Sequence, residues 1–203
     1  MERMGGQRQE WAGAPPGAFL RPWTADDVDV RAVLHAFAAP DMLGQSPAPI
    51  ATAQEARDWI AALVRDPADT EPRSLAWAIE LDGSAVGHVM VSAINRRHLT
   101  GWVSYWVAAG ARGRGLAGAA AAALAEHCFT VLGLERLELG HRVNNPASGR
   151  VAAAAGFTQE GVERRKLRYR DDDGSWRRFD TALWARLATD PEPAVAPLGL
   201  RRG

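Results

Sequence analysis

The residues best suited to chemistry form a glycine-rich run from Arg112 to Gly118, which reads Arg-Gly-Arg-Gly-Leu-Ala-Gly. The run follows an apolar, strand-like segment (Val103–Val107) and opens an alanine-rich segment (Ala119–Leu132) that we expect to be helical. The first N–H groups of a helix have no partner within it and lie at the positive end of its dipole. Arg112 and Arg114 add fixed positive charge and forked donors. The run therefore predicts an anion site, most often a phosphate site.

Two common phosphate loops fit this run less well. A nucleoside-triphosphate loop needs Lys and then Ser or Thr after its second glycine, but Leu116 and Ala117 follow Gly115. The dinucleotide-binding pattern G-x-G-x-x-G is present from Gly113 to Gly118, and Glu135 or Glu138 follows at a suitable distance. The pattern lies late in the chain, without repeated strand–helix units around it. A dinucleotide-dependent oxidoreductase therefore stays as a disfavoured alternative.

A third pattern fits better, because Arg112-x-x-Gly115-x-Ala117 resembles the R/Q-x-x-G-x-G/A signature of the GCN5-related N-acetyltransferase (GNAT) family. Further landmarks, from about Leu20 to Leu187, resemble the ribosomal-protein-alanine-type (RimJ/RimL-like) members of that family. They occur in the family's order: Leu20-Arg21-Pro22-Trp23, Asn145-x-x-Ser148-x-x-Val151 and Ala155-Gly156-Phe157. The resemblance implies an enzyme, an acetyl-CoA-dependent N-acetyltransferase that needs no metal.

The resemblance also implies which residues hold acetyl-CoA. Backbone groups of Val107 and Ala109 would bind the pantetheine arm, and the Val107 N–H would meet the thioester carbonyl. The pyrophosphate would lie on the backbone amides of Arg112, Gly113, Arg114, Gly115, Leu116, Ala117 and Gly118. Asn145 would bond the pantetheine, act only as the N-cap before Pro146, or serve both purposes.

Catalytic groups are harder to assign. Ser148, close to the coenzyme in the first turn of a helix, would protonate the departing thiolate, or it would only complete the helix cap. Asn144 is a weaker candidate. Many relatives carry a glutamate base three residues before the Tyr-Trp pair, but this chain has Trp102 there. A water relay to solvent remains, as do four possible bases: Glu80, His88, His98 and His141.

The acceptor would be a protein N-terminal α-amine or a small amine. Residues 24–73, expected to form a helical flap over the acceptor, carry nine acidic side chains and four arginines, a net charge of −5. They either attract a cationic amine or are solvated helix faces. Residues 164–178 carry seven basic and three acidic side chains, a net charge of +4. This charge indicates either a solvent-exposed face of a sheet or a surface that contacts an acidic partner. Trp23 and Trp59 either line an amine pocket or pack in the core.

Composition agrees with one globular domain. The 203 residues are 47% hydrophobic and 24% charged, with a formal net charge of zero, so neither nucleic acid nor membrane is an indicated partner. The single cysteine, Cys128, has helical spacing with apolar neighbours and is expected in the core. We find no signal peptide or long apolar run, and we expect a cytoplasmic protein, a monomer or homodimer. Residues 1–17 and 189–203 are expected to be mobile tails around a domain at 18–188.

The elements implied by periodicity and turn signals follow one order: a strand, two helices, an antiparallel meander, a helix, a strand, a helix and a final hairpin. The expected fold class is α/β, with a mixed, largely antiparallel twisted sheet of about six to seven strands flanked by about four helices, which is the acyl-CoA N-acyltransferase fold. The expected ranges are 26–38 and 52–64 (helices), 75–81, 86–94 and 102–107 (meander), 119–132 (helix), 137–141 (strand), 145–156 (helix), and 167–170 with 176–184 (hairpin). A non-catalytic acyl-CoA-binding module is the alternative to an enzyme within this fold.

Overall fold

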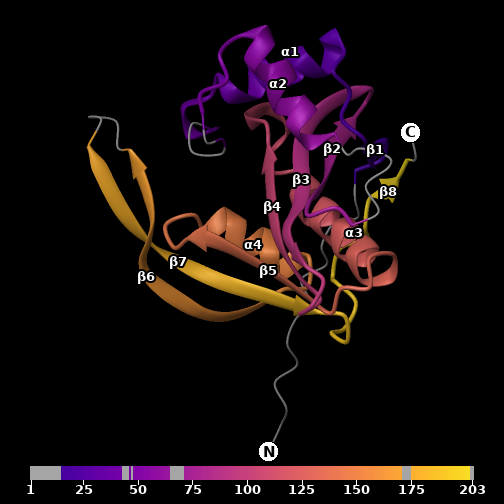
Figure 1. Cartoon of the computed structure of the whole chain (residues 1–203), viewed down its shortest axis with the longest axis vertical. Helices are drawn as coiled ribbons and strands as arrows, with labels where there is room; N and C mark the ends of the chain where they lie inside the picture. Colours follow the sequence, from indigo (N-terminus) through magenta and orange to yellow (C-terminus); the bar gives the residue numbers. More distant parts are fainter. Residues whose placement is uncertain (1–14, 43–45, 47, 65–70, 171–174, 202–203) are drawn as a thin grey trace, which may run out of the picture.

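The computed structural model describes residues 15–42, 46, 48–64, 71–170 and 175–201, and its strands form one eight-stranded sheet in the order β6-β7-β5-β4-β3-β2-β1-β8 (Figure 1). The strands are β1 (Ala18–Arg21), β2 (Leu75–Leu81), β3 (Ser84–Asn95), β4 (Thr100–Val107), β5 (Arg136–Arg142), β6 (Thr158–Arg170), β7 (Trp176–Leu187) and β8 (Gly199–Leu200). The α-helices are α1 (Asp27–Phe37), α2 (Ala53–Leu63), α3 (Leu116–Thr130) and α4 (Pro146–Ala154). The predicted α/β class and element order are confirmed, with β8 as an additional strand.

The sheet separates two apolar layers, because successive side chains of a strand point to opposite faces. Ile79 of β2 faces the core that holds α3, whereas its neighbour Ala78 faces the cluster under α1 and α2. Helix α3 is buried on nearly all sides, and its alanines allow close approach to the sheet. Cys128 is fully buried in this helix, so its predicted core role is confirmed.

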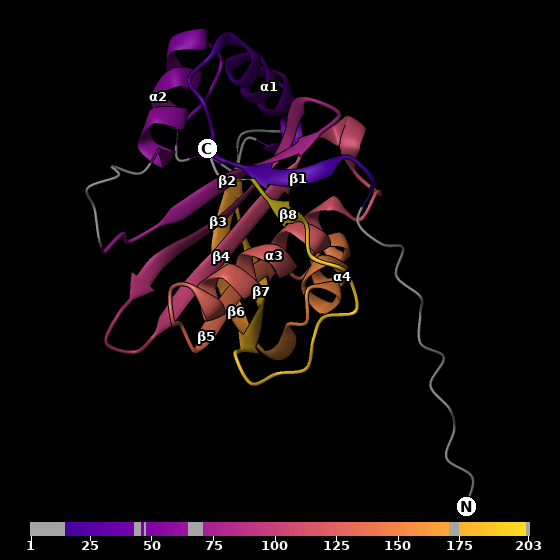
Figure 2. The ribbon, with the colours of Figure 1, turned by 90° about the vertical axis from the view of Figure 1, so that its right-hand side faces the viewer.

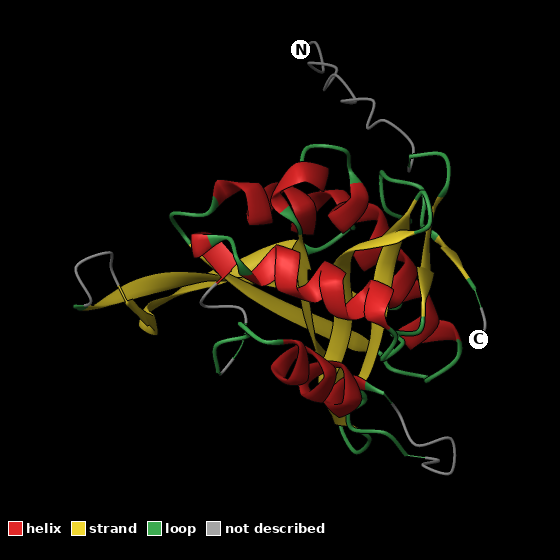
Figure 3. Ribbon diagram, turned by 90° about the horizontal axis from the view of Figure 1, so that it is seen from above, coloured by secondary structure: helices red, strands yellow, loops and turns green. Residues whose placement is uncertain are grey.

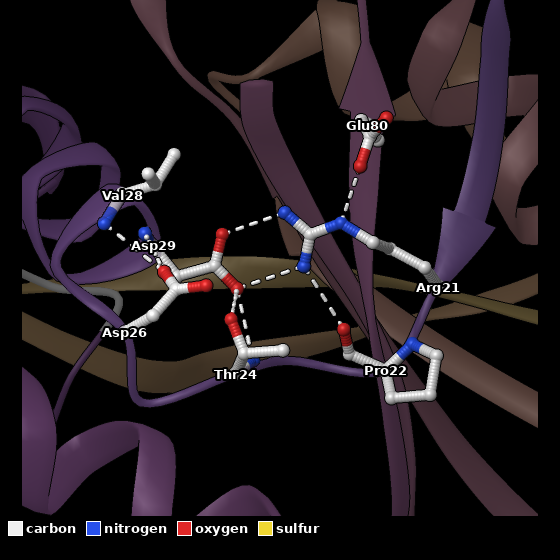
Figure 4. Close-up of polar contacts among 7 residues, drawn as sticks. All are labelled: Arg21, Pro22, Thr24, Asp26, Val28, Asp29 and Glu80. Carbon is white, nitrogen blue, oxygen red and sulfur yellow. Dashed lines mark hydrogen bonds and ion pairs between the residues drawn. The ribbon is translucent and has the colours of Figure 1, made fainter. Parts of the chain in front are cut away.

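A buried ion-pair network fixes the start of α1 against the sheet (Figure 4). The carboxylate of Asp29, with none of its surface exposed, accepts two hydrogen bonds from the Arg21 guanidinium, at 2.6 and 2.7 Å. Arg21 also pairs with Glu80 of β2, and Thr24 donates to Asp29 through its N–H and its hydroxyl. Asp26 is the N-cap of α1, and its side chain accepts from the N–H groups of Val28 and Asp29. Helix α1 is thus tied to β1 and β2.

The C-terminal segment, which we expected from the sequence to be a mobile tail, packs against the body of the molecule in the structure. Val195 and Leu198 are each 4% exposed, and the Leu198 N–H donates to the Ala119 carbonyl of α3 at 3.2 Å. Strand β8 then pairs with β1 in parallel, so the segment from residue 191 to residue 201 forms a strap along α3 (Figure 2). Residues 1–14 of the expected N-terminal tail lie outside the described residues.

The last hairpin is longer than expected and projects from the body of the molecule. Strand β6 begins at Thr158 rather than at Leu167, and it pairs with β7 through two register shifts. Beyond the end of β5 the two strands continue as a ribbon away from the helices (Figures 1 and 3).

Candidate active site

An opening between β4 and β5 is the centre of the candidate site. The two parallel strands pair only from Thr100 to Trp102 on β4, and they separate after that point. On the other edge of β4 the antiparallel register continues to Val107, and the Ala108 N–H donates to the Val86 carbonyl at 2.9 Å. Inter-strand bonding alternates along an antiparallel strand. The backbone groups of Tyr105 and Val107 therefore point away from β3 and into the opening.

The opposite wall of the opening is built in the same way. Val143 donates its N–H to the Asp180 carbonyl of β7 at 3.0 Å, which sets the alternation along β5. By that alternation Gly140 turns its backbone groups toward β4, where the strands no longer pair. The opening is thus lined by peptide groups without ladder partners, which suits a ligand that carries amides of its own.

The glycine-rich loop lies just beyond this opening. Gly113 and Gly115 have φ angles of +76° and +77°, a backbone region that favours glycine. Helix α3 begins at Leu116 without a side-chain cap, so its first amides face outward. No atom lies within 4 Å of a Cβ built at either glycine, which leaves open space for an anion. The surrounding sheet is largely antiparallel, which argues against the doubly wound dinucleotide fold.

The structure gives the Arg112 side chain a different task from the one expected. Its Nε donates to the Val107 carbonyl at 2.8 Å, and its Nη1 pairs with Asp41 at 2.5 Å. This uses one of the two lone pairs of the Val107 carbonyl oxygen and leaves the Val107 N–H for a ligand. Arg114 is exposed and has no ion pair among the residues described in the structure, so it is the better placed cation for a phosphate.

Asn145 and Ser148 lie at the start of α4, as the sequence predicts. Asn145 is the N-cap and its side chain accepts from the Ser148 N–H at 3.3 Å, with Pro146 in the first turn. The hydroxyl of Tyr105 lies 2.7 Å from the Ser148 hydroxyl and 3.1 Å from the Ser148 carbonyl oxygen. Sequence reasoning gave Tyr105 no role, although the alternation of β4 places its side chain on the face that α3 and α4 cover.

Two of the candidate bases, His88 and His141, are histidines whose ring nitrogens already have hydrogen-bond partners. His88 is 5% exposed, accepts from the Trp23 indole at 3.1 Å, and has a pKa that burial lowers to about 3. The Nδ1 of His141 lies 2.9 Å from the Arg142 carbonyl oxygen, and its Nε2 accepts from Trp184 at 3.0 Å. Neither imidazole is suited to take a proton from an amine in the opening.

The other candidate bases lie in the wrong places. Glu80, on β2, is paired with Arg21 of β1. His98 lies in the turn that precedes β4, whereas Val107 is the last residue of β4. Trp102, which takes the place of the family glutamate, lies over Gly140, where an added Cβ would be 3.1 Å from the indole. Glu80 therefore lies two strands away from β4, and His98 lies at the far end of β4 from Val107.

The face of the sheet under α1 and α2, where we expected the acceptor, is apolar rather than acidic. Trp23, at 4% exposure, packs with His88, Trp59 and Trp106 in one aromatic cluster, so the core interpretation of Trp23 is the better one. A cavity of about 330 Å³ lies between the end of α1 and the segment before α2. Its lining is almost wholly apolar: Leu34, Phe37, Ala38, Ala48, Pro49, Ile50 and Ala51.

The acidic side chains of the flap serve mainly local structure. Among the described residues of the flap, these carboxylates are N-caps or have polar side-chain partners: Asp26, Asp27, Asp29, Asp41, Glu55 and Asp58. Asp66 and Asp69 lie outside the described residues. The net negative charge of the flap is therefore weak support for a cationic acceptor.

Two further properties concern the described residues as a whole. No helix among them is long and apolar enough to cross a membrane. Within the same residues, no group of three or more His, Cys, Asp or Glu side chains could hold a metal ion.

Comparisons with known proteins place the site in context. Residues 18–158 match a family model described as an acetyltransferase (GNAT) domain. Mycobacterium smegmatis RimJ, solved with CoA-disulfide, is 30% identical with a TM-score of 0.69, over 87% of this chain and 85% of that one. A putative ribosomal-protein-serine acetyltransferase from Vibrio cholerae is 20% identical with a TM-score of 0.67, over 85% and 95%. A spermidine N-acetyltransferase chimera of V. cholerae SpeG and hSSAT is 17% identical with a TM-score of 0.65, over 85% and 96%. The search of curated proteins finds no match.

Proposed function

The chain belongs to the GNAT acetyltransferase family, and on that premise we propose that it moves an acetyl group from acetyl-CoA to a primary amine by direct attack on the thioester. The observation that carries this proposal is the opening between β4 and β5, which adjoins the uncapped N-terminus of α3. An elongated donor with amides at one end and a pyrophosphate at the other fits these two features together. The family assignment favours an enzyme over a non-catalytic binding module.

The residues present fit coenzyme A. We assign the pyrophosphate to the backbone amides from Gly113 to Gly118, with Arg114 as the nearby cation. The Arg112 N–H, which the sequence led us to include, donates instead to the Ala109 carbonyl at 3.3 Å. The pantetheine arm would run along β4, where the N–H groups of Tyr105 and Val107 are directed into the opening. The roles of Ala109 and of the Asn145 side chain remain predictions; the Asn145 amide keeps its NH₂ donors while its oxygen caps α4.

Acetyl-CoA supplies an activated acyl group, so the protein needs no nucleophile of its own. The N–H group of Val107 would stabilise the oxygen that becomes negative when the amine attacks the carbonyl carbon. As the carbon–sulfur bond breaks, its electron pair goes to sulfur, and the Ser148 hydroxyl would donate its proton there. Ser148 then regains a proton from water, and the amine loses its proton to water in the relay that needs no side-chain base.

We propose a protein N-terminal α-amine as the first acceptor to test, with a small amine second. The RimJ likeness at 30% identity favours the protein acceptor, whereas the spermidine enzyme at 17% shares the fold. The test measures thiol release from acetyl-CoA with hexapeptides that begin in Ala, Ser or Met, with the same peptides blocked at the N-terminus, and with spermidine. We expect turnover with a free-amine peptide and none with its blocked form.

Two results would contradict parts of the proposal. Turnover with spermidine alone would move the acceptor to small polyamines. Isothermal titration that detects no binding of CoA would refute the donor assignment, and a parallel titration with NAD checks the dinucleotide alternative.

A further inference from the structure

A pair of hydroxyl groups spans the candidate site. Tyr105 comes from β4 and Ser148 from α4, and they are 43 positions apart in the chain. Their oxygens lie 2.7 Å apart, where the ladder between β4 and β5 has already ended. The side chain of Tyr105 packs against the main core, so its hydroxyl has little freedom to move.

We propose that Tyr105 is a positioning residue that holds the Ser148 hydroxyl with its proton directed toward the opening. This inference rests on the proposed function, in which Ser148 donates to the sulfur of coenzyme A. Tyr105 itself would not touch the sulfur. It acts through Ser148, and its own backbone N–H serves the opening separately.

The count of donors and acceptors supports this arrangement. The N–H of Ser148 is already used by the Asn145 cap, and its carbonyl lies within α4, where the helix supplies a donor. Tyr105 has one proton to give. The Tyr105 hydroxyl can donate it to the Ser148 carbonyl oxygen, at 3.1 Å, or to the Ser148 hydroxyl oxygen, at the shorter distance of 2.7 Å. When Tyr105 donates to the hydroxyl oxygen, the serine proton is left for a third atom. That atom is the sulfur when the coenzyme lies in the opening.

The titration of Tyr105 agrees with a donor role. Burial raises the pKa of Tyr105 to about 12, and the bond to Ser148 offsets only part of that rise. The phenol thus keeps its proton over the neutral range, and Ser148 has a constant partner. A phenolate would instead draw the serine proton away from the opening.

The experiment titrates the thiol of CoA bound to the protein, with the complex of desulfo-CoA as the spectroscopic reference. A hydrogen bond to a thiolate favours the charged form and lowers the pKa of the thiol. We expect a lower thiol pKa in the wild-type complex, and a rise of about one unit in Ser148→Ala and in Tyr105→Phe. Cys128 does not interfere, because burial raises its own pKa to about 12.

Two further variants sharpen the test. Tyr169→Phe makes the same change on the projecting ribbon and should titrate like the wild type. The double variant of Tyr105 and Ser148 should match Ser148→Ala alone, because Tyr105 acts through the serine. Melting curves establish that each variant is folded.

The two possible failures can be told apart. If Ser148→Ala raises the thiol pKa and Tyr105→Phe does not, Tyr105 has no positioning role and the proposed function stands. If neither variant changes the pKa, Ser148 does not reach the sulfur. Its acid role in the proposed function then fails together with this inference.

Discussion

At the scale of residues, the candidate site depends more on backbone groups than on side chains. Tyr105 and Val107 contribute N–H groups through strand alternation, and Gly113 and Gly115 contribute the shape of the loop. Such roles tolerate many side chains but few changes of backbone conformation. The sharpest tests therefore separate backbone strain from charge.

Gly115 allows that separation. Asp and Asn have the same shape, and both tolerate a positive φ better than most residues, so Gly115→Asp and Gly115→Asn should share their strain. Only Asp places a negative charge where we assign the pyrophosphate. We expect Gly115→Asp to bind CoA at least about tenfold more weakly than Gly115→Asn in isothermal titration. Equal affinities for the two variants would refute the phosphate assignment.

His88 makes stability depend on pH. Its folded pKa is lowered to about 3, whereas an unfolded histidine titrates near 6.5. Below pH 6.5, His88 therefore binds a proton in the unfolded chain but stays neutral in the folded protein. The free energy of unfolding then falls as the pH falls toward 3. Between pH 6.5 and 4.5 we expect a loss of about 2 to 3 kcal/mol from this group in urea unfolding.

The control for this effect is His88→Asn, which keeps an acceptor for the Trp23 indole but does not titrate. Its baseline stability will be lower, so the slope against pH is the quantity to compare. The pKa of His127 is also lowered by burial, but His127 is present in both proteins and cancels. An unchanged slope in His88→Asn would show that His88 is already protonated or exposed in the folded state.

Sequence reasoning at this scale succeeded where the cause is local. Asn145 and Pro146 predict a helix start from their own conformational preferences, and the structure confirms it. The apolar spacing of Cys128 predicts its burial, which is also confirmed. The bond between Tyr105 and Ser148 was missed because 43 residues separate its partners, and only the meeting of β4 with α4 reveals it.

At the scale of elements, the start of α1 shows how one buried carboxylate holds a helix in place. Asp29→Ala would remove one of the two acidic partners of the Arg21 guanidinium, whose side chain is mostly buried (Figure 4). We expect this change to lower the free energy of unfolding by about 3 to 5 kcal/mol. Asp27→Ala on the same helix removes an exposed pair with Arg57 and should cost less than about 1 kcal/mol. Similar losses in both variants in urea unfolding would contradict the structural role of Asp29.

The elements that the sequence predicted well are those with regular periodicity. Thr52 with Glu55 forms a capping box at the start of α2, and the larger apolar side chains of β2 alternate along the strand, although both faces of β2 are covered. The first half of β6 was missed because Thr158–Lys166 is polar on both faces. Its two register shifts, at Gln159–Gly161 and Glu163–Leu167, also interrupt the period of two on which strand prediction depends.

At the scale of the whole molecule, the C-terminal strap is the largest departure from the expected organisation. Three prolines in the segment discourage regular structure, and this favoured a mobile tail. Val195 and Leu198 nevertheless reach the main core, and β8 extends the sheet beyond β1. Val195 and Leu198 lie in an irregular segment, so no hydrophobic periodicity marks them in the sequence. Their burial depends on packing against α3, which only the folded structure reveals.

The strap also lies along the first turns of the helix that we assign to the coenzyme. Leu198 donates to the Ala119 carbonyl, and Val195 lies 3.9 Å from the Cβ position of Gly118. Leu198→Ala should therefore remove packing from the core, at a cost of about 2 to 5 kcal/mol. For a chain of this length, such a loss lowers the melting temperature by about 5 to 15 °C.

Leu200→Ala is the matched control, since Leu200 is two residues further along the same segment but 39% exposed. We expect its melting temperature to fall by only a few degrees. Because the strap supports α3 and not its amides directly, Leu198→Ala below its melting temperature should bind CoA nearly as the wild type does, and saturating CoA should restore part of the lost thermal stability. A melting temperature for Leu198→Ala equal to that of Leu200→Ala would mean that the strap detaches in solution, and residues 191–201 would then be the mobile tail that the sequence first suggested.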